Sequence, residues 1–313
     1  MLAGARRAPY EDEMSDLPDL YLPAAMAPSL MAELAQRFRI HRDNPPATTR
    51  AIVGGGSVLV DTALLDALPA LEIVAVNGVG HDRIDLAAAR SRGVRVTTTP
   101  DVLISDVADL AIGLMLAVDR RIAFNDRAVR AGGWDVPLGR RTSGRRIGIF
   151  GFGQIGQAIA RRAEPFASEV LYTARHERPD LRFRFVPDIA ALADACDTLI
   201  LIAPGGKETR HIVDAAVLEK LGEQGVLINV ARGSLVDEPA LVAALAAGTI
   251  AGAGLDVFEN EPQVPDALKA MDRVVLMPHQ GSATVECRVA MAALVLANLD
   301  AHFAGLPLVT PIL

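Results

Sequence analysis

A glycine-rich turn is the feature that most constrains the fold of this chain. The turn, Gly151-Phe-Gly153-Gln-Ile-Gly156, follows the apolar run Arg146–Phe150 and opens a helical pattern over Ile155–Ala167. In such a unit the first glycine permits a tight turn, the second lets the backbone approach a pyrophosphate, and the third allows close helix packing. The helix start, at Gln154 and Ile155, offers free N–H groups to phosphate. The motif therefore predicts a Rossmann-type sheet that binds a dinucleotide.

The residues after the next strand indicate which dinucleotide binds. Sites for NAD place an acidic residue about 20 residues after the motif, where it binds the ribose 2′-hydroxyl. Here Arg175 stands 19 residues after Gly156 and is followed by His176. An arginine can pair with a 2′-phosphate and stack on adenine, so the sequence favours NADPH over NADH. The alternative is a solvated basic loop in which Glu177 takes the acidic role.

Alternating strand and helix patterns extend to both sides of this unit and predict two domains. The length of 313 residues fits about two domains of roughly 150 residues each. Helical patterns are expected at 28–37, 101–131 (capped by Asp101), 155–167 and 282–304. Strands are expected at 19–22, 51–53, 71–76 and 94–96, then at 146–150, 169–173, 198–203, 226–230, 251–257 and 273–277. Repeated strand–helix units imply doubly wound parallel sheets.

The last helical pattern has no strand after it, which suggests that the chain returns to its first domain. We therefore expect a flavodoxin-like substrate-binding domain of residues 1–102 and 286–313. A Rossmann NAD(P)-binding domain of residues 103–285 would be inserted into it. The predicted class is α/β, with two doubly wound parallel sheets.

Composition excludes several other classes of protein. The net charge of −7 argues against a nucleic-acid partner, which would require a basic face. Cys196 and Cys287 form no metal-ligand spacing and are expected to be buried and reduced. No apolar run reaches the roughly 18 residues of a membrane span, and the N-terminus lacks the apolar core of a secretory signal. We expect a cytoplasmic protein without a metal site.

Three predicted strands end in residues suited to carbonyl reduction. Arg232 follows the strand near 226–230, Glu261 follows the strand near 251–257, and His279 follows the strand near 273–277. Parallel sheets bind ligands beyond the carboxyl ends of their strands, so these side chains should converge on the dinucleotide. His279 can act as a general acid, Glu261 can orient it, and Arg232 can hold a substrate carboxylate. A structural role is the alternative for any single histidine.

Several motifs resemble the D-2-hydroxyacid dehydrogenase family over nearly the whole chain. They are Thr99-Pro-Asp-Val-Leu, Gly225-Val-Leu-Ile-Asn-Val-Ala-Arg-Gly, Val236-Asp-Glu-Pro, Gly252-Ala-Gly-Leu-Asp-Val-Phe-Glu and Gly281-Ser-Ala-Thr-Val-Glu. Within the family, they look like the NADPH-dependent hydroxyphenylpyruvate and glyoxylate/hydroxypyruvate reductases. The resemblance implies reduction of small 2-oxo acids to D-2-hydroxy acids by a homodimer built on the cofactor domains.

The resemblance also implies further contacts. Substrate would be bound by the loop Asn77-Gly78-Val79-Gly80. From its place on the last predicted helix, Arg288 is expected to be a second carboxylate contact, with a salt bridge as the alternative. Trp134 would reach a neighbouring subunit, unless it has a core or surface role. The nicotinamide side is implied for Val107, Val230, Asp256 and Gly281, with Pro204 and Thr209 flanking the cofactor. Two other functions stay open: a dinucleotide sensor, or a family dehydrogenase acting on a different 2-hydroxy acid.

Overall fold

The chain forms two compact units, each with its own parallel sheet. The computed structural model describes residues 17–56 and 58–313; the N-terminal segment considered for a secretory signal lies outside them. One unit contains residues up to Val102 together with Val285–Leu313, and the other contains Leu103–Thr284. The second unit is therefore inserted into the first along the chain. The predicted fold class, two doubly wound α/β units, is confirmed.

The discontinuous unit is built on five parallel strands in the order β2-β1-β3-β4-β5, the strand order of flavodoxin-like folds. Its strands are β1 (Asp19–Tyr21), β2 (Arg39–His41), β3 (Thr49–Gly54), β4 (Ile73–Val76) and β5 (Arg95–Thr97). Its helices are α2 (Pro28–Arg37), α3 (Thr62–Ala67), α4 (Leu86–Ser91) and α12 (Val285–Phe303). The sequence prediction missed β2, because this strand is a partly exposed Arg-Ile-His run with no apolar pattern.

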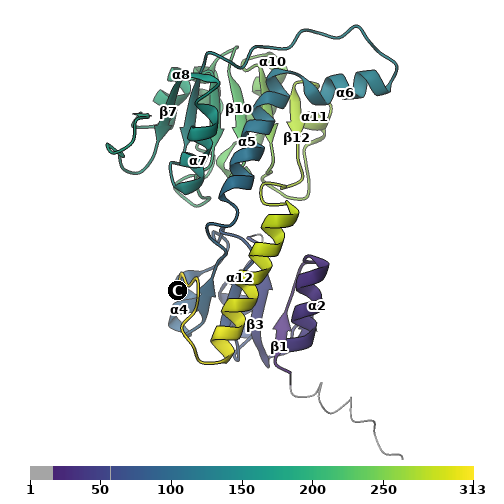
Figure 1. The fold of residues 1–313 in the computed structure, drawn as a ribbon, viewed down its shortest axis with the longest axis vertical. Helices are drawn as coiled ribbons and strands as arrows, with labels where there is room; N and C mark the ends of the chain where they lie inside the picture. Colours follow the sequence, from purple (N-terminus) through teal and green to yellow (C-terminus); the bar gives the residue numbers. More distant parts are fainter. Residues whose placement is uncertain (1–16, 57) are drawn as a thin grey trace, which may run out of the picture. The chain divides into compact units, whose positions relative to one another are not determined.

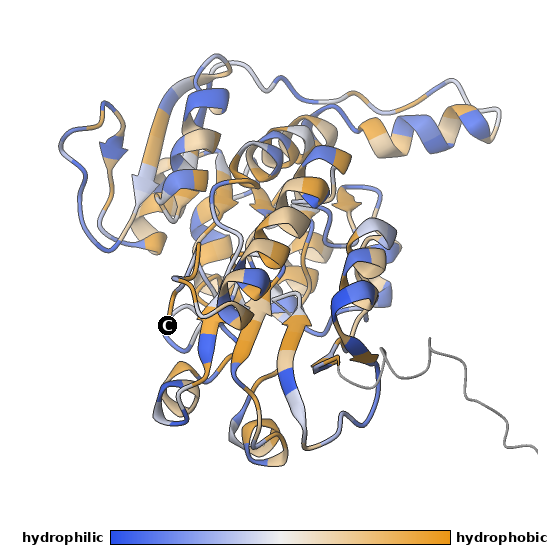
Figure 2. Ribbon diagram, turned by 60° about the horizontal axis from the view of Figure 1, so that its bottom comes forward, coloured by the Kyte–Doolittle hydropathy of each residue, from blue (hydrophilic) through white to orange (hydrophobic). Residues whose placement is uncertain are grey.

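Both faces of this sheet are buried at its centre, which explains why β4 is apolar at every position. In β4, Ile73 and Ala75 join a core cluster with Leu299 of α12, whereas Val74 and Val76 join a second cluster on the other face. Alternate side chains of a strand point to opposite faces, so a sheet covered by helices on both sides requires continuous apolar runs. Figure 2 shows this apolar character along the strands.

The inserted unit contains seven parallel strands in the order β12-β11-β10-β9-β6-β7-β8. Six of them have the dinucleotide-binding order, and β12 extends the sheet by one strand. Its strands are β6 (Arg145–Phe150), β7 (Ala167–Thr173), β8 (Arg184–Phe185), β9 (Thr198–Leu201), β10 (Val226–Asn229), β11 (Gly252–Leu255) and β12 (Val274–Leu276). The predicted count of six strands was wrong. The two-residue β8 depends on pairing with β7, where Phe185 lies opposite Tyr172.

Helices α5 (Ile104–Asp119) and α6 (Ile122–Arg130) replace the single helix predicted over 101–131. Arg121 has a left-handed φ of 53°, and the carbonyl of Asp119 accepts the backbone N–H of Arg140 at 2.6 Å. The Asp119 carbonyl is hydrogen-bonded to Arg140, and α5 ends at this residue. Asp101 does not cap α5, because it is itself left-handed (φ 68°) and the N-cap is Leu103. Figure 1 shows α6 extending away from the sheet of its own unit.

The remaining helices of the inserted unit pack against its sheet. Helix α7 starts as predicted but ends before residue 167, because Ala167 begins β7. The other elements are α8 (Ile189–Ala195), α9 (Ala215–Leu221), the 3-10 turn Gly233–Leu235, α10 (Glu238–Ala247) and α11 (Asp266–Lys269); α7 spans Gln154–Ala163. No helix among the described residues is both long and apolar enough to cross a membrane.

Candidate active site

The three glycines of the turn after β6 have different surroundings. A Cβ on Gly151, which has φ 99°, would lie 2.5 Å from the backbone nitrogen of Ala203, and one on Gly156 would lie 2.2 Å from the carbonyl oxygen of Gly151. A Cβ on Gly153 would meet no described atom within 4 Å. Packing therefore explains two glycines, whereas the third leaves the backbone open to an approaching ligand.

Helix α7 begins beside this open backbone. Its N-cap is Gly153, which has no side chain to cap the first amides, and its first residues are Gln154 and Ile155. Unpaired amides at a helix start attract anions. The turn fits the diphosphate of a dinucleotide.

Arg175 carries the first charged side chain after β7. It is exposed, as are His176 and Glu177. The hydroxyl of Tyr172 in β7 accepts the backbone N–H of Arg178 at 2.7 Å, which fixes the loop against the strand end. A cationic rather than an acidic side chain thus stands directly after the strand next to β6.

Further predicted cofactor residues follow β9 and β10, which lie on the other side of β6 from β7. Thr209 donates a hydrogen bond from its hydroxyl to the carbonyl of Pro204 at 2.9 Å, after β9. Val230 is buried after β10. Because β6 to β12 are parallel, these segments share the carboxyl edge of the sheet with the glycine turn.

Asp256, directly after β11, organises the segment that carries His279. Its buried carboxylate accepts the backbone N–H groups of Gln280 at 2.6 Å and Gly281 at 2.8 Å, and its carbonyl accepts that of His279 at 2.8 Å. A Cβ on Gly281 would lie 3.3 Å from Asp256 Oδ2 and 3.4 Å from Val107 Cγ2. Burial raises the pKa of Asp256, although the two amides and His279 oppose this rise.

His279 and Glu261 form a hydrogen-bonded pair. His279 Nδ1 lies 2.8 Å from Glu261 Oε2, and Glu261 Oε1 accepts the backbone N–H of Phe258 at 3.0 Å. His279 has a left-handed φ of 55°, which is unusual for a residue with a side chain. Burial acts to raise the pKa of Glu261, but the hydrogen bond and charge of His279, the Phe258 amide and Arg232 together lower it. Glu261 is therefore held as an anion beside the imidazole.

Arg232 lies in the turn after β10, which Asn229 supports. Asn229 accepts the backbone N–H of Ala231 at 3.1 Å through its side-chain oxygen and donates to the carbonyl of Arg232 at 2.9 Å. A Cβ on Gly233 would lie 1.8 Å from the carbonyl carbon of Phe258. The turn after β10 thus packs directly on the turn that carries Glu261. Sequence reasoning missed Asn229, although a buried polar residue at the end of an apolar strand is a usable signal.

The predicted substrate residues other than Arg232 belong to the discontinuous unit. Val79 and Gly80 follow β4, in a loop where the backbone N–H of Thr99 donates to the carbonyl of Gly78 at 2.8 Å. Arg288 lies in the first turn of α12 and is partly buried. These residues therefore lie on different elements of one unit, and His279, Glu261 and Arg232 lie on the other.

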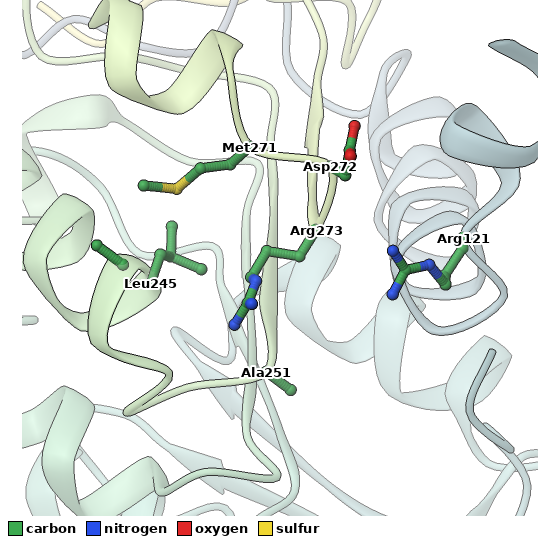
Figure 3. A pocket seen from close by; sticks show the side chains of 7 residues that line it. Arg121, Leu245, Ala251, Met271, Asp272 and Arg273 are labelled. Atoms are coloured by element: carbon green, nitrogen blue, oxygen red, sulfur yellow. The ribbon is translucent and has the colours of Figure 1, made fainter. Parts of the chain in front are cut away.

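A pocket of about 530 Å³ lies at the opposite edge of the seven-stranded sheet (Figure 3). It is lined by Arg121, Leu245, Ala246, Ala251, Met271, Asp272 and Arg273. Ala251 and Arg273 directly precede β11 and β12, so this is the amino edge. None of the residues predicted from sequence lines it. Among the described residues, no group of three or more histidine, cysteine or acidic side chains could hold a metal ion.

Comparison with known proteins identifies the family. Residues 112–281 match the model of the D-isomer specific 2-hydroxyacid dehydrogenase NAD binding domain. The chain is 48% identical over 301 residues to a hydroxyphenylpyruvate reductase of Plectranthus scutellarioides, covering 92% of this chain and 96% of the relative. It is 45% identical over 311 residues to a 2-ketogluconate reductase of Gluconobacter oxydans (strain 621H), covering 96% of this chain and 100% of the relative.

A solved structure agrees with these sequence matches. It is an NADPH-dependent glyoxylate/hydroxypyruvate reductase from Sinorhizobium meliloti in complex with NADP and malonate. It superimposes with a TM-score of 0.89 at 44% identity, covering 94% of this chain and 96% of the other. The resemblance stated from the sequence is confirmed: the chain belongs to the D-isomer-specific 2-hydroxyacid dehydrogenases, a family of oxidoreductases.

Proposed function

We propose that this protein reduces small 2-oxo acids to D-2-hydroxy acids with NADPH. One observation carries the proposal: His279 and Glu261 form a 2.8 Å pair at the edge of the sheet where the glycine turn opens. The pair supplies an oriented proton donor next to a site that fits a dinucleotide. Similarity to the hydroxyphenylpyruvate and glyoxylate/hydroxypyruvate reductases adds support.

Each residue of the pair, together with Arg232, has a distinct role in this proposal. Bound NADPH would supply the hydride that adds to the carbonyl carbon. The His279 nitrogen that faces Glu261 is Nδ1, so the proton for the carbonyl oxygen leaves from Nε2. Glu261, kept as an anion, favours the protonated imidazole and fixes its orientation. Arg232 binds the substrate carboxylate and polarises the ketone.

The inserted unit would bind the cofactor and the discontinuous unit the substrate. The preference for NADPH would come from Arg175, assisted by His176, through pairing with the 2′-phosphate. On the discontinuous unit, backbone N–H groups of Val79 and Gly80 would bind the carboxylate, with Arg288 as a second contact. Glyoxylate and hydroxypyruvate are the first substrates of this proposal, and phenylpyruvates are the second.

The protein would act as a cytoplasmic homodimer built on the cofactor-binding units. Every residue of α6 is at least partly exposed, and the segment after it exposes Trp134 at 88% and Leu138 at 93%. A nine-residue helix is not stable alone in water, so a second copy packing on α6 would account for it. Both cysteines are buried thiols, and burial raises the pKa of Cys196 to about 12, which suits a reducing compartment.

The proposal is tested by initial rates with NADPH and NADH against glyoxylate, hydroxypyruvate, pyruvate and phenylpyruvate. We expect turnover of at least one acid and a strong preference for NADPH. An NADH preference would overturn the role of Arg175 and leave the chemistry intact. Tight NADPH binding without turnover of any acid would instead favour the sensor.

A second candidate substrate is 2-ketogluconate, because the chain is 45% identical to a 2-ketogluconate reductase over almost its whole length. Adding this sugar acid to the same assay decides between the substrates. A kcat/KM for 2-ketogluconate above that for glyoxylate and hydroxypyruvate would replace the first proposal.

A further inference from the structure

Glu238 is a buried carboxylate close to the candidate active site, and it takes no part in the reaction proposed for that site. It is the first residue of α10 and only 7% exposed, although glutamate is rarely buried unless it is paired. Its Oε1 accepts the backbone N–H of Glu259 at 2.8 Å. Burying a carboxylate costs free energy unless it is hydrogen-bonded or paired, so this contact is expected to have a structural purpose.

The contact joins α10 to the turn that carries Glu261. Two consecutive backbone N–H groups of this turn are held by carboxylates: that of Phe258 by Glu261 and that of Glu259 by Glu238. On its other side the turn meets Gly233, where an added Cβ would lie 1.8 Å from the carbonyl carbon of Phe258. Glu238 therefore helps to fix the turn on which Glu261 faces His279.

Glu238 also belongs to a group of interacting charges. The side chain of Glu259 pairs with Arg210 at 2.7 Å and with His211 at 2.8 Å. Burial raises the pKa of Glu238, the Glu259 amide lowers it, the charges of Glu259 and Glu261 raise it further, and His211 lowers it. Glu238 and Glu261 thus interact electrostatically as well as through the turn.

The charges that face His279 come from three segments. Glu261 bonds its ring and Asp256 interacts with its charge, while Arg232 interacts with Glu261.

We propose that Glu238 is a positioning residue for the His279–Glu261 pair: it anchors the turn of residues 258–261, so that Glu261 stays in hydrogen-bonding position beside His279. This inference rests on the proposed function, because it assigns to His279 the role of proton donor. Glu238 acts through Glu259 and Glu261, without touching substrate or cofactor.

Two substitutions test the anchor. Glu238→Gln keeps an oxygen that can accept the Glu259 N–H, whereas Glu238→Ala removes it. We expect Glu238→Ala to lower kcat about tenfold or more with little change in KM, and Glu238→Gln to restore most of it. Equal kcat values for wild type and Glu238→Ala would overturn the anchoring role.

The matched control for Glu238→Ala is Glu219→Ala, at an exposed position on α9, which should leave kcat and KM unchanged. A loss of kcat in Glu219→Ala as large as that in Glu238→Ala would overturn the assignment of the effect to the Glu259 contact.

An NMR measurement keeps this test independent of turnover. The ring resonances of His279 can be followed in the full chain, with His279→Gln used for assignment. They should move in Glu238→Ala and return toward their wild-type positions in Glu238→Gln even if no tested acid is reduced. If they do so but no acid turns over, the proposed function fails and the anchoring role stands; if they do not move in Glu238→Ala, the anchoring role fails. Thermal unfolding of each variant identifies a loss of fold.

Discussion

The two edges of the seven-stranded sheet both hold pairs of basic and acidic side chains, but in different backbone settings. At the amino edge, Arg146 of β6 pairs with Asp197 at 2.8 Å. At the carboxyl edge, His279 pairs with Glu261 at the same distance, and the side chain of His279 is 49% exposed. Distance and exposure alone therefore do not separate a structural pair from a candidate catalytic one.

The backbone separates them. Arg146 lies within strand β6, opposite Glu169 of β7, although the register of that pairing shifts between Arg145 and Arg146. His279 has a left-handed φ in a segment held by Asp256, and Glu261 lies in a turn held by Glu238. Residues held in sparsely populated conformations by surrounding contacts are concentrated at functional sites. The carboxyl edge is thus organised to hold side chains in position for a ligand, whereas at the amino edge the charged side chains of Arg146 and Asp197 only compensate each other.

The largest effect is expected from removing the imidazole at the carboxyl edge. His279→Ala should lower kcat by about 10²- to 10⁴-fold, because a positioned general acid contributes that much. NADPH binding, measured by fluorescence titration, should be unchanged. The control is His41→Ala, which removes a histidine–carboxylate pair of 2.7 Å with Asp19 in the other unit. If both variants lose activity equally, His279 has a structural role instead.

The cofactor preference should respond next. Arg175→Asp should reduce the ratio of kcat/KM with NADPH to that with NADH by about 10- to 100-fold, the value of one or two charge-assisted hydrogen bonds. Arg178→Asp, three residues further along the same loop, is the comparison. An unchanged ratio in Arg175→Asp would show that the preference for NADPH comes from another part of the loop.

The glycine turn allows a matched pair of substitutions within one motif. Gly156→Ala should destabilise the fold by about 1–3 kcal/mol, because its Cβ would overlap the carbonyl oxygen of Gly151. Gly153→Ala should leave the unfolding temperature unchanged but weaken NADPH binding about tenfold or more, since its Cβ would project toward the ligand. Calorimetry and NADPH titration of both variants measure the two effects. A destabilised Gly153→Ala would remove the distinction between packing and binding.

The smallest effect is expected at the amino edge. Burial acts to raise the pKa of Asp197, but hydrogen bonds from Arg146 and the nearby positive charges lower it below its ordinary value. The pair therefore stabilises the fold fully above that ordinary value, and this stabilisation is lost as the pH falls through the lowered pKa of the folded state.

Asp197→Asn should accordingly cost no more than about 1 kcal/mol at pH 7 and leave kcat unchanged, because the pair is substantially exposed. Urea unfolding at pH 7 and at pH 3 should show that the difference from wild type decreases in acid. A difference that grows in acid would contradict the direction given for Asp197.

Much of the fold and of the candidate site was predictable because each feature depends on residues close in sequence. The helix at 28–37 was predicted to the residue, and each strand of the inserted sheet except β8 was located. The glycine turn and the three strand ends were readable because strand, turn and polar residue follow one another directly. Errors occurred where a distant segment decided the outcome, as with β2, β8 and the helix over 101–131.

The sequence by itself determined the two α/β units, the family and the side chains at the strand ends, because apolar periodicity and glycine spacing act over short stretches of chain. Only the tertiary structure decided that the Asp119 carbonyl accepts the backbone N–H of Arg140. The same holds for the Glu238 carboxylate, which accepts the N–H of Glu259, 21 residues away. A hydrogen bond between distant residues leaves no periodic trace, because its partners meet only when separate turns pack together. That packing is also what makes a buried glutamate at the start of α10 part of the candidate site.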